Sequence, residues 1–173
     1  GRIASEESES GYGWDYDTFV DDLYALTPTE TILPAIVDGF ISDNGGASSS
    51  RGDQTLSYLD LSKMANYKAK WEAMAAALKN KITSSNASSF RSLVKSAKHF
   101  ADSDYTYFGT FDAKDFLNKL QSNSTFNPGG TYISETLTAF SQLVKYSVAQ
   151  KGAGNAYGLC MFFSTSSSAQ KDD

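Results

Sequence analysis

The spacing of hydrophobic residues predicts a chain built mostly of amphipathic helices, with a few short strands between them. In about six segments, apolar side chains recur every three or four residues, which places them on one face of a helix. Asp17 is placed to cap the first helix, and Thr27-Pro-Thr-Glu30 predicts a capping box with proline at the first helical position of the second. The predicted stripes are Phe19, Val20 and Leu23; Leu33, Ile36, Val37, Phe40 and Ile41; Met64, Tyr67, Trp71, Met74, Ala75, Leu78 and Ile82, after Ser62 as N-cap; Phe90, Leu93, Val94 and Ala97; Phe116, Leu117 and Leu120, after Asp112 as N-cap; and Ile133, Leu137, Phe140, Val144 and Val148.

Three segments have the composition of β-strands. Arg2–Glu7 is a short strand-like entry, Thr55–Asp60 alternates in polarity, and Tyr157–Ser164 contains a continuous apolar run. Strands separated by helices favour a sheet with parallel pairs. Such a sheet would be small, and its last strand requires burial on both faces. We therefore expect further strands from another polypeptide or from a preceding part of the precursor.

The remaining segments are polar and rich in glycine and serine. The stretch 43–53 predicts an exposed flexible loop, and 165–173 predicts a polar tail. The loop contains Arg51-Gly-Asp53, an integrin-type tripeptide, but a match of three residues recurs by chance. The length of the chain suits one hydrophobic core, so we predict that residues 1–173 form part of one domain.

Composition and charge exclude several classes of protein. Apolar residues make up 40% of the chain and aromatic residues 13%, as in folded globular proteins. The net charge of −5 argues against a nucleic-acid partner, because phosphate binding requires a basic face. No apolar run approaches the roughly 20 residues that a membrane span needs. Richness in serine, threonine and asparagine with an acidic balance fits an exported protein.

The chain has one cysteine and one histidine, and neither sits in a catalytic pattern. Cys160 lies inside the apolar run Tyr157–Phe163, where a buried thiol would be inert. His99 falls where we predict the C-terminal end of a helix, a position that favours it electrostatically. A serine hydrolase is also disfavoured, because the sequence lacks a Gly-x-Ser-x-Gly elbow. A catalytic dyad within this chain is therefore not expected.

Several segments, in the same order and at similar spacing, resemble the clostripain family of cysteine peptidases over nearly the whole chain. The most specific is the Glu-Glu…Gly-Trp-Asp-Tyr signature, which looks like the segment that follows the catalytic cysteine in that family. The matching segments are Ala4-Ser-Glu-Glu7 with Gly11-Tyr-Gly-Trp-Asp-Tyr16, Ile36-Val-Asp-Gly-Phe40, Thr55-Leu-Ser-Tyr-Leu-Asp-Leu-Ser62 and Tyr157-Gly-Leu-Cys-Met-Phe-Phe163.

The resemblance implies a caspase-like α/β/α sandwich, of which this chain would supply part of the sheet and most of the later helices. It implies a His/Cys dyad that cleaves after arginine or lysine, and self-cleavage into two chains that stay associated. In the family the dyad precedes the Ser-Glu-Glu segment, so this chain would be the heavy chain, and its partner an N-terminal light chain carrying the histidine and the cysteine. Substrates would be proteins or peptides with basic residues. The location would be secreted, periplasmic or at a bacterial cell surface.

The resemblance also points to substrate-binding residues in this chain. Trp14 would form a wall of the substrate pocket, since its flat face suits the stem of an arginine. Glu6, Glu7, Asp15 and Asp17 are candidates to pair with a guanidinium group, which a carboxylate binds through two hydrogen bonds. The alternative for the same residues is structural, with the aspartates as helix caps and the glutamates solvated. Calcium dependence occurs in the family, but the acidic residues here show no spaced ligand loop.

A second function remains open at this point. The chain could be a non-catalytic binding or surface domain that keeps the caspase-like scaffold and has lost the dyad. Tyr12, Trp14, Tyr16 and the aromatic run 105–108 would then form a recognition surface. A histidine and a nucleophilic cysteine in the precursor or in a companion chain would distinguish the two.

Overall fold

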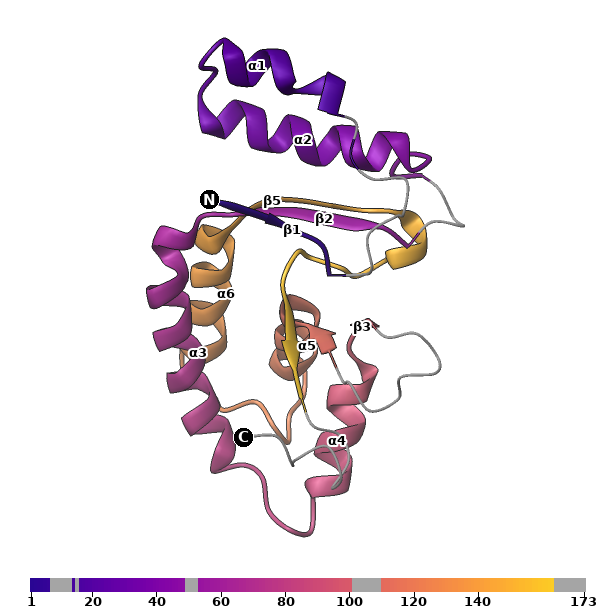
Figure 1. The fold of residues 1–173 in the computed structure, drawn as a ribbon. Coiled ribbons are helices and arrows are strands. Elements are labelled where there is room, and N and C mark those ends of the chain that lie inside the picture. Colours follow the sequence, from indigo (N-terminus) through magenta and orange to yellow (C-terminus); the bar gives the residue numbers. More distant parts are fainter. Residues whose placement is uncertain (7–13, 15, 49–52, 101–109, 164–173) are drawn as a thin grey trace, which may run out of the picture. The chain divides into compact units, whose positions relative to one another are not determined.

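A computed structural model describes residues 1–6, 14, 16–48, 53–100 and 110–163 (Figure 1). The chain divides into two compact units. Unit 1 comprises Gly1–Leu61 and Val144–Gly158, and unit 2 comprises Ser62–Leu143 and Leu159–Asp173. Unit 1 is thus completed by a segment that follows most of unit 2 in the sequence.

Unit 1 consists of a three-stranded sheet covered by a helix. The strands lie in the order β1-β2-β5, and both pairs are antiparallel. Its elements are β1 (Arg2–Ala4), a 3-10 helix (Tyr16–Thr18), α1 (Val20–Tyr24), α2 (Thr29–Asp43), β2 (Thr55–Leu59), β5 (Val144–Ala149) and a 3-10 helix (Lys151–Ala153). In Figure 1, α2 runs along one face of this sheet and α1 packs beyond it.

The core of unit 1 forms between α2 and β2. The predicted α2 stripe is confirmed, because Val37, Phe40 and Ile41 are buried and pack against Leu56 and Tyr58. Every residue of β2 is buried. Successive side chains of a strand point to opposite faces, so Thr55 and Ser57, which alternate with Leu56 and Tyr58, face away from α2. That second face carries the candidate site described below.

Unit 2 is mainly helical, with a second small sheet. Its strands lie in the order β3-β4-β6, again with antiparallel pairs. A 3-10 helix (Leu61–Lys63) leads into it, and its elements are α3 (Met64–Lys79), α4 (Ala87–Ser96), β3 (His99–Phe100), β4 (Thr110–Asp112), α5 (Ala113–Gln121), α6 (Tyr132–Leu143) and β6 (Cys160–Phe162). Its core contains Met74, Leu78, Val94, Ala97, Phe111, Phe116, Leu117, Leu120, Phe126 and Ile133.

The start of α5 follows the sequence prediction. The side chain of Asp112 accepts a hydrogen bond of 2.7 Å from the amide of Asp115, so Asp112 is the N-cap. The carboxylate of Asp115 in turn accepts the amide of Lys98 at 2.7 Å. Phe116 and Leu117 then face inward with no exposed surface, as predicted. Capping and the apolar stripe therefore act together at this helix.

Three predicted N-caps are wrong. The N-cap of α1 is Phe19 instead of Asp17, that of α2 is Pro28 instead of Thr27, and that of α3 is Lys63 instead of Ser62. Asp17 and Ser62 lie instead in short 3-10 helices that precede α1 and α3. A 3-10 turn shifts the first helical residue without changing the apolar stripe, so the helices themselves were still predicted.

The helix predicted to run through Val148 ends at Leu143, and Val144–Ala149 forms β5. This segment alternates in polarity and pairs along its length with β2, so sheet pairing overrides the helical spacing. His99 likewise lies in a strand and not at a helix end. The predicted parallel pairing is also wrong, because the described pairs are all antiparallel. The α/β class itself is confirmed.

The last strand is shorter than predicted, and Cys160 within it is half-buried instead of buried. The loop 43–53 is described at 43–48 and 53, and the predicted polar tail lies outside the described residues. Among the helices that the structure describes, none is long and apolar enough to cross a membrane.

Candidate functional site

The backbone at Gly158 crosses the face of the β1-β2-β5 sheet that points away from α2. Gly158 has a φ of +100°, and a Cβ atom there would lie 2.8 Å from Cβ of Ser57 and 2.9 Å from Cβ of Ser147. Ser57 and Ser147 are direct partners on β2 and β5. Two small side chains and a glycine are therefore what allow the chain to lie this close to the sheet.

Both backbone groups of Gly158 are held by side chains of unit 1. Its amide donates to Oε2 of Glu6 at 2.7 Å, and its carbonyl accepts from the hydroxyl of Ser57 at 2.8 Å. Ser57 is also within 3.1 Å of the carbonyl of Ala4, the last residue of β1. A buried backbone group must be paired to avoid the cost of desolvation, so this arrangement fixes Gly158 against the sheet.

The chain that leaves β1 is fixed by the same face of β2. The amide of Glu6 donates to the hydroxyl of Thr55 at 2.9 Å, and the hydroxyl of Ser5 lies 3.2 Å from it. Thr55 is buried. The hydroxyls of Thr55 and Ser57, on alternate residues of β2, therefore anchor the start of the segment that carries the predicted substrate-binding residues.

Trp14 lies in a different part of unit 1. Its ring packs on Phe40 of α2, with centroids 5.7 Å apart and a tilt of 51°, and it is partly buried against both apolar clusters of the unit. Phe40 and its neighbours cover the α2 face of the sheet, whereas Glu6 binds Gly158 on the other face. The described contacts of Glu6 and Trp14 thus lie on different faces of the sheet, with the Gly158 amide on one and the Phe40 ring on the other.

Of the other predicted pocket residues, the structure describes only Asp17. Asp17 is exposed in the 3-10 helix before α1. Glu7 and Asp15 lie outside the described residues, as do Tyr12 and the aromatic run 105–108. The role of these carboxylates in binding a basic side chain stays a prediction.

His99 and Cys160 lie in the β3-β4-β6 sheet of unit 2, in positions that keep them apart. His99 pairs with Phe111, which pairs with Met161, so these three occupy one row of the sheet. Cys160 pairs with Asp112, in the neighbouring row. Adjacent rows face opposite sides, so the imidazole and the thiol point away from each other across two strand spacings of about 4.8 Å each. The register thus sets the two side chains on opposite sides of this sheet.

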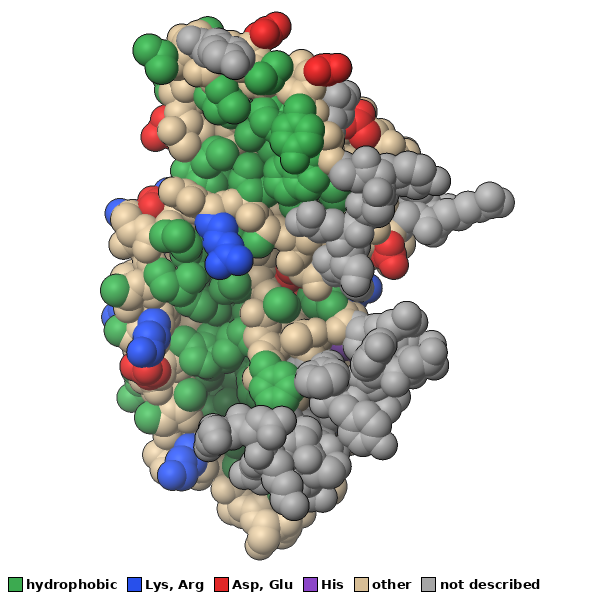
Figure 2. Space-filling model, viewed as in Figure 1, with side chains coloured by type: hydrophobic (Ala, Val, Ile, Leu, Met, Phe, Trp, Pro, Cys, Tyr) green, Lys and Arg blue, Asp and Glu red, His purple; other side chains and the backbone are tan. Residues whose placement is uncertain are grey.

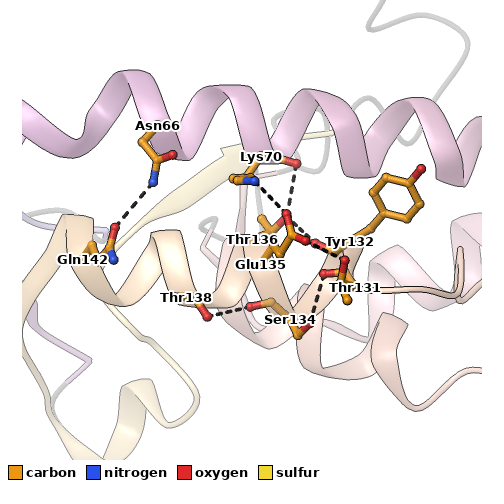
Figure 3. A network of polar contacts seen from close by, with 9 residues as sticks. All are labelled: Asn66, Lys70, Thr131, Tyr132, Ser134, Glu135, Thr136, Thr138 and Gln142. Atoms are coloured by element: carbon orange, nitrogen blue, oxygen red, sulfur yellow. Dashed lines mark hydrogen bonds and ion pairs between the residues drawn. The ribbon is translucent and has the colours of Figure 1, made fainter.

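A shallow polar groove of about 340 Å³ lies between α3 and α6 of unit 2 (Figure 3). Lys70 forms an ion pair of 2.7 Å with Glu135, and the hydroxyl of Thr131 donates to the same carboxylate at 2.5 Å. These contacts, from Lys70 first and Thr131 second, hold the pKa of Glu135 below its usual value. The polar groups are bonded to one another, and none belongs to the predicted site. The groove is lined by Asn66, Lys70, Thr131, Ser134, Glu135, Thr138, Ala139 and Gln142.

Two tyrosines have raised pKa values for structural reasons. The hydroxyl of Tyr146 donates to Oδ1 of Asp38 at 2.7 Å, which links β5 to α2 and raises the pKa of the tyrosine. Burial, and then the charge of Asp112, raises the pKa of Tyr67 well above its ordinary range. Neither hydroxyl is therefore poised for proton transfer near neutral pH.

No group of three or more His, Cys, Asp or Glu in the described part of the chain could hold a metal ion.

Sequence patterns alone do not identify Gly158 and Thr55 as partners of Glu6, or Ser57 as a partner of Gly158. Their signal is the pair of hydroxyl residues on alternate positions of a buried strand, together with a glycine within the last apolar run. Both features are visible in the sequence. The contact between the glycine and the strand depends on the pairing of β2 with β5, which no local pattern predicts.

Comparisons with known proteins agree with this fold. The model of the clostripain family matches residues 2–172. A solved structure of a clostripain from Bacteroides thetaiotaomicron ATCC 29148, in complex with the peptide inhibitor BTN-VLTK-AOMK, superposes with a TM-score of 0.63 at 19% sequence identity. The alignment covers 98% of this chain and 70% of that one. A search of curated proteins finds no match. The likeness supports the caspase-like α/β architecture.

Proposed function

The chain belongs to the clostripain family, and we propose that it is the heavy-chain part of a cysteine endopeptidase that cleaves after arginine or lysine. Family membership supports the cysteine-peptidase function itself. In the proposal, this chain supplies walls of the substrate pocket, and the His/Cys dyad lies on the N-terminal portion of the precursor or on a partner chain. The whole enzyme would act by thiolate attack, acyl-enzyme formation and hydrolysis, with the imidazole as base.

The register of the β3-β4-β6 sheet is the observation that carries the location of the dyad. His99 and Cys160 are the only histidine and cysteine in the sequence, and they face opposite sides of that sheet. A thiol and its general base must come within hydrogen-bonding reach to act together. The proposal therefore places both catalytic groups outside this chain.

Specificity for a basic side chain has two supports. The inhibitor bound to the similar clostripain carries the peptide VLTK, which ends in lysine. In this chain, the segment around Trp14 is acidic, and a carboxylate there could hold a guanidinium through two hydrogen bonds. We assign the pocket role to Trp14 and Asp15 first. Glu6 is engaged with the Gly158 amide and is assigned mainly to holding the segment in place.

Single substitutions in the full precursor test the proposed location of the dyad. Cys160→Ala and His99→Ala should each retain cleavage of peptides with arginine before the scissile bond, because neither side chain belongs to the dyad. A matched peptide with glutamate at that position should not be cut. Loss of activity in either variant, with the protein still folded, would place the dyad in this chain and overturn the proposal.

The alternative is a non-catalytic surface domain on the same scaffold. The observation in its favour is that Tyr16 is 65% exposed beside the Trp14 segment, as a recognition residue would be. A precursor that folds, carries no second cysteine and shows no peptidase activity would favour it. For either function we propose export from a bacterial cell, since the similar clostripain comes from a bacterium.

A further inference from the structure

One face of the segment that includes α1 carries large apolar side chains in contact with solvent. Tyr16, Leu23 and Leu26 are 65%, 51% and 88% exposed. Phe19 is buried in the core of unit 1. Its ring centroid lies 5.7 Å from that of Tyr16. Tyr16, Phe19, Leu23 and Leu26 follow one another at intervals of three or four residues across the 3-10 helix, α1 and its C-terminal turn, so the apolar side chains lead from the core out to solvent.

Leu26 occupies a position that disfavours any side chain. Its φ is +55°, the left-handed conformation in which glycine or asparagine normally ends a helix. The amide of Leu26 donates to the carbonyl of Leu23, and the amide of Thr27 donates to that of Asp22, which is the Schellman pattern. An exposed leucine gains nothing from burial here and carries the strain of the backbone. Folding therefore does not account for it, and an outlier of this kind points to function.

The sequence that carries these residues is acidic. The sequence from Ile3 to Ser50 contains ten aspartate and glutamate residues and no lysine, arginine or histidine. Asp21 and Glu30 are exposed, and Asp22 is partly exposed. Figure 2 shows the result at the top of the view, where hydrophobic side chains over α1 and α2 are bordered by acidic ones. A negative rim around an apolar centre selects positively charged partners and speeds their association.

We propose that the face formed by Tyr16, Leu23 and Leu26, here called the docking face, binds a basic amphipathic segment of the protein substrate, away from the bond that is cut. Apolar side chains of that segment would cover the three exposed residues, and its lysine and arginine side chains would meet the acidic rim. The identity of the partner as substrate rests on the proposed function. The contact itself does not require cleavage.

Binding is measured on the protein produced from the full precursor. This protein is first treated with an arginine-directed peptidyl inhibitor, so that it does not cleave the peptide probe. The probe is a fluorescent helical peptide of leucine and lysine, and its matched control is a peptide of leucine and glutamate. The variants are Leu26→Asn and Leu23→Ser, and the control variant is Leu61→Ser, which alters a leucine that is 45% exposed elsewhere. Anisotropy gives the affinities, and thermal unfolding gives the stability of each variant.

We expect the lysine peptide to bind, with an affinity that falls as salt rises, and the glutamate peptide not to bind. Leu26→Asn and Leu23→Ser should each weaken binding about tenfold. Leu61→Ser should not, and Leu26→Asn should not lower the unfolding temperature. Equal affinity for all variants or for both peptides would overturn the proposal. So would a homodimer in sedimentation that Leu26→Asn dissociates, because the face would then bind a second copy.

The outcome is separable from the proposed function. Absence of binding with intact cleavage of short arginine peptides overturns only the docking face. Binding without any cleavage of such peptides overturns the peptidase proposal and leaves the docking face standing.

Discussion

The amide of Gly158 donates a hydrogen bond of 2.7 Å to the carboxylate of Glu6, which lies 152 residues earlier in the chain. This contact joins the segment after β1 to the segment before β6. We expect Glu6→Ala to lower the free energy of unfolding by about 1–3 kcal/mol, because it leaves a buried amide unpaired. Glu6→Gln keeps an acceptor oxygen and should restore much of that loss. Urea unfolding of the two variants measures the difference.

The same pair of variants distinguishes two roles of Glu6, fixing the segment after β1 and binding the basic side chain of a substrate. If Glu6 only holds the segment, Glu6→Gln should leave the KM for arginine peptides close to that of the native enzyme. A large rise in KM with unchanged stability would assign Glu6 to the basic side chain instead.

Gly158→Ala should be more damaging than an ordinary glycine substitution. The new Cβ would meet Ser57 at 2.8 Å, in addition to the strain of a φ of +100°. We expect a loss of about 2–4 kcal/mol in the free energy of unfolding. Gly46→Ala is the matched control, since Gly46 has a φ of +76° but no atom within 4 Å of the added Cβ. It should cost about 1 kcal/mol, and equal losses for the two variants would contradict the close approach.

Asp112→Ala should destabilise unit 2. It removes the N-cap of α5, and Asp112 is fully buried, so about 2 kcal/mol is expected. Asp112→Asn retains an acceptor and should cost less. Exchange of the Asp115 amide hydrogen should accelerate in the alanine variant, and an unchanged exchange rate would show that the cap does not hold that amide.

Glu135 in the groove of unit 2 should make the stability of the fold depend on pH. The contacts of Glu135 with Lys70 and Thr131 lower the pKa of its carboxyl group in the folded state. The resulting stabilisation is complete above the unfolded value, near 4.5, and is lost as pH falls through the lower folded value. Glu135→Gln should therefore be less stable than the native chain at neutral pH and equal to it in strong acid. A thermal unfolding series in pH checks this, with Glu72→Gln of the more distant Lys68 pair, at 3.7 Å, as control.

Leu26→Asn should raise the free energy of unfolding by up to about 1 kcal/mol, because asparagine tolerates the left-handed conformation better than leucine. Thermal unfolding measures the change. A clear loss of stability would mean that the leucine side chain packs against the fold, and the case for the docking face would weaken accordingly.

Local features of the sequence predicted most of the helices. The stripe from Ile36 to Ile41 and the cap at Asp112 depend on residues within a turn or two of each other, so the sequence contains all that determines them. Val144 and Val148 misled the helix prediction because a spacing of four residues suits one helical face and also one face of a strand. Pairing with β2, some ninety residues earlier in the chain, makes this segment a strand. No local pattern predicts that pairing.

The candidate site was less predictable for the same reason. The resemblance to the clostripain family predicts that Glu6 is a candidate partner for a basic substrate side chain. Its observed partner, Gly158, depends on the pairing of Ser57 with Ser147 and on the path of the chain over that pair. The pocket role of Trp14 stays a prediction, and the structure shows its ring packed against two apolar clusters of unit 1. Contacts of this range follow from the sheet and not from spacing.

The central claim is that the catalytic groups lie outside this chain. The most direct test is to treat the natively purified protein with a fluorescent, arginine-directed peptidyl electrophile and to separate the products on a denaturing gel, with intact mass spectrometry of each band. The account predicts a tightly associated second polypeptide that carries the label, and loss of peptidase activity in step with labelling. Label on Cys160, or an active preparation that contains only the 173-residue chain, would contradict it.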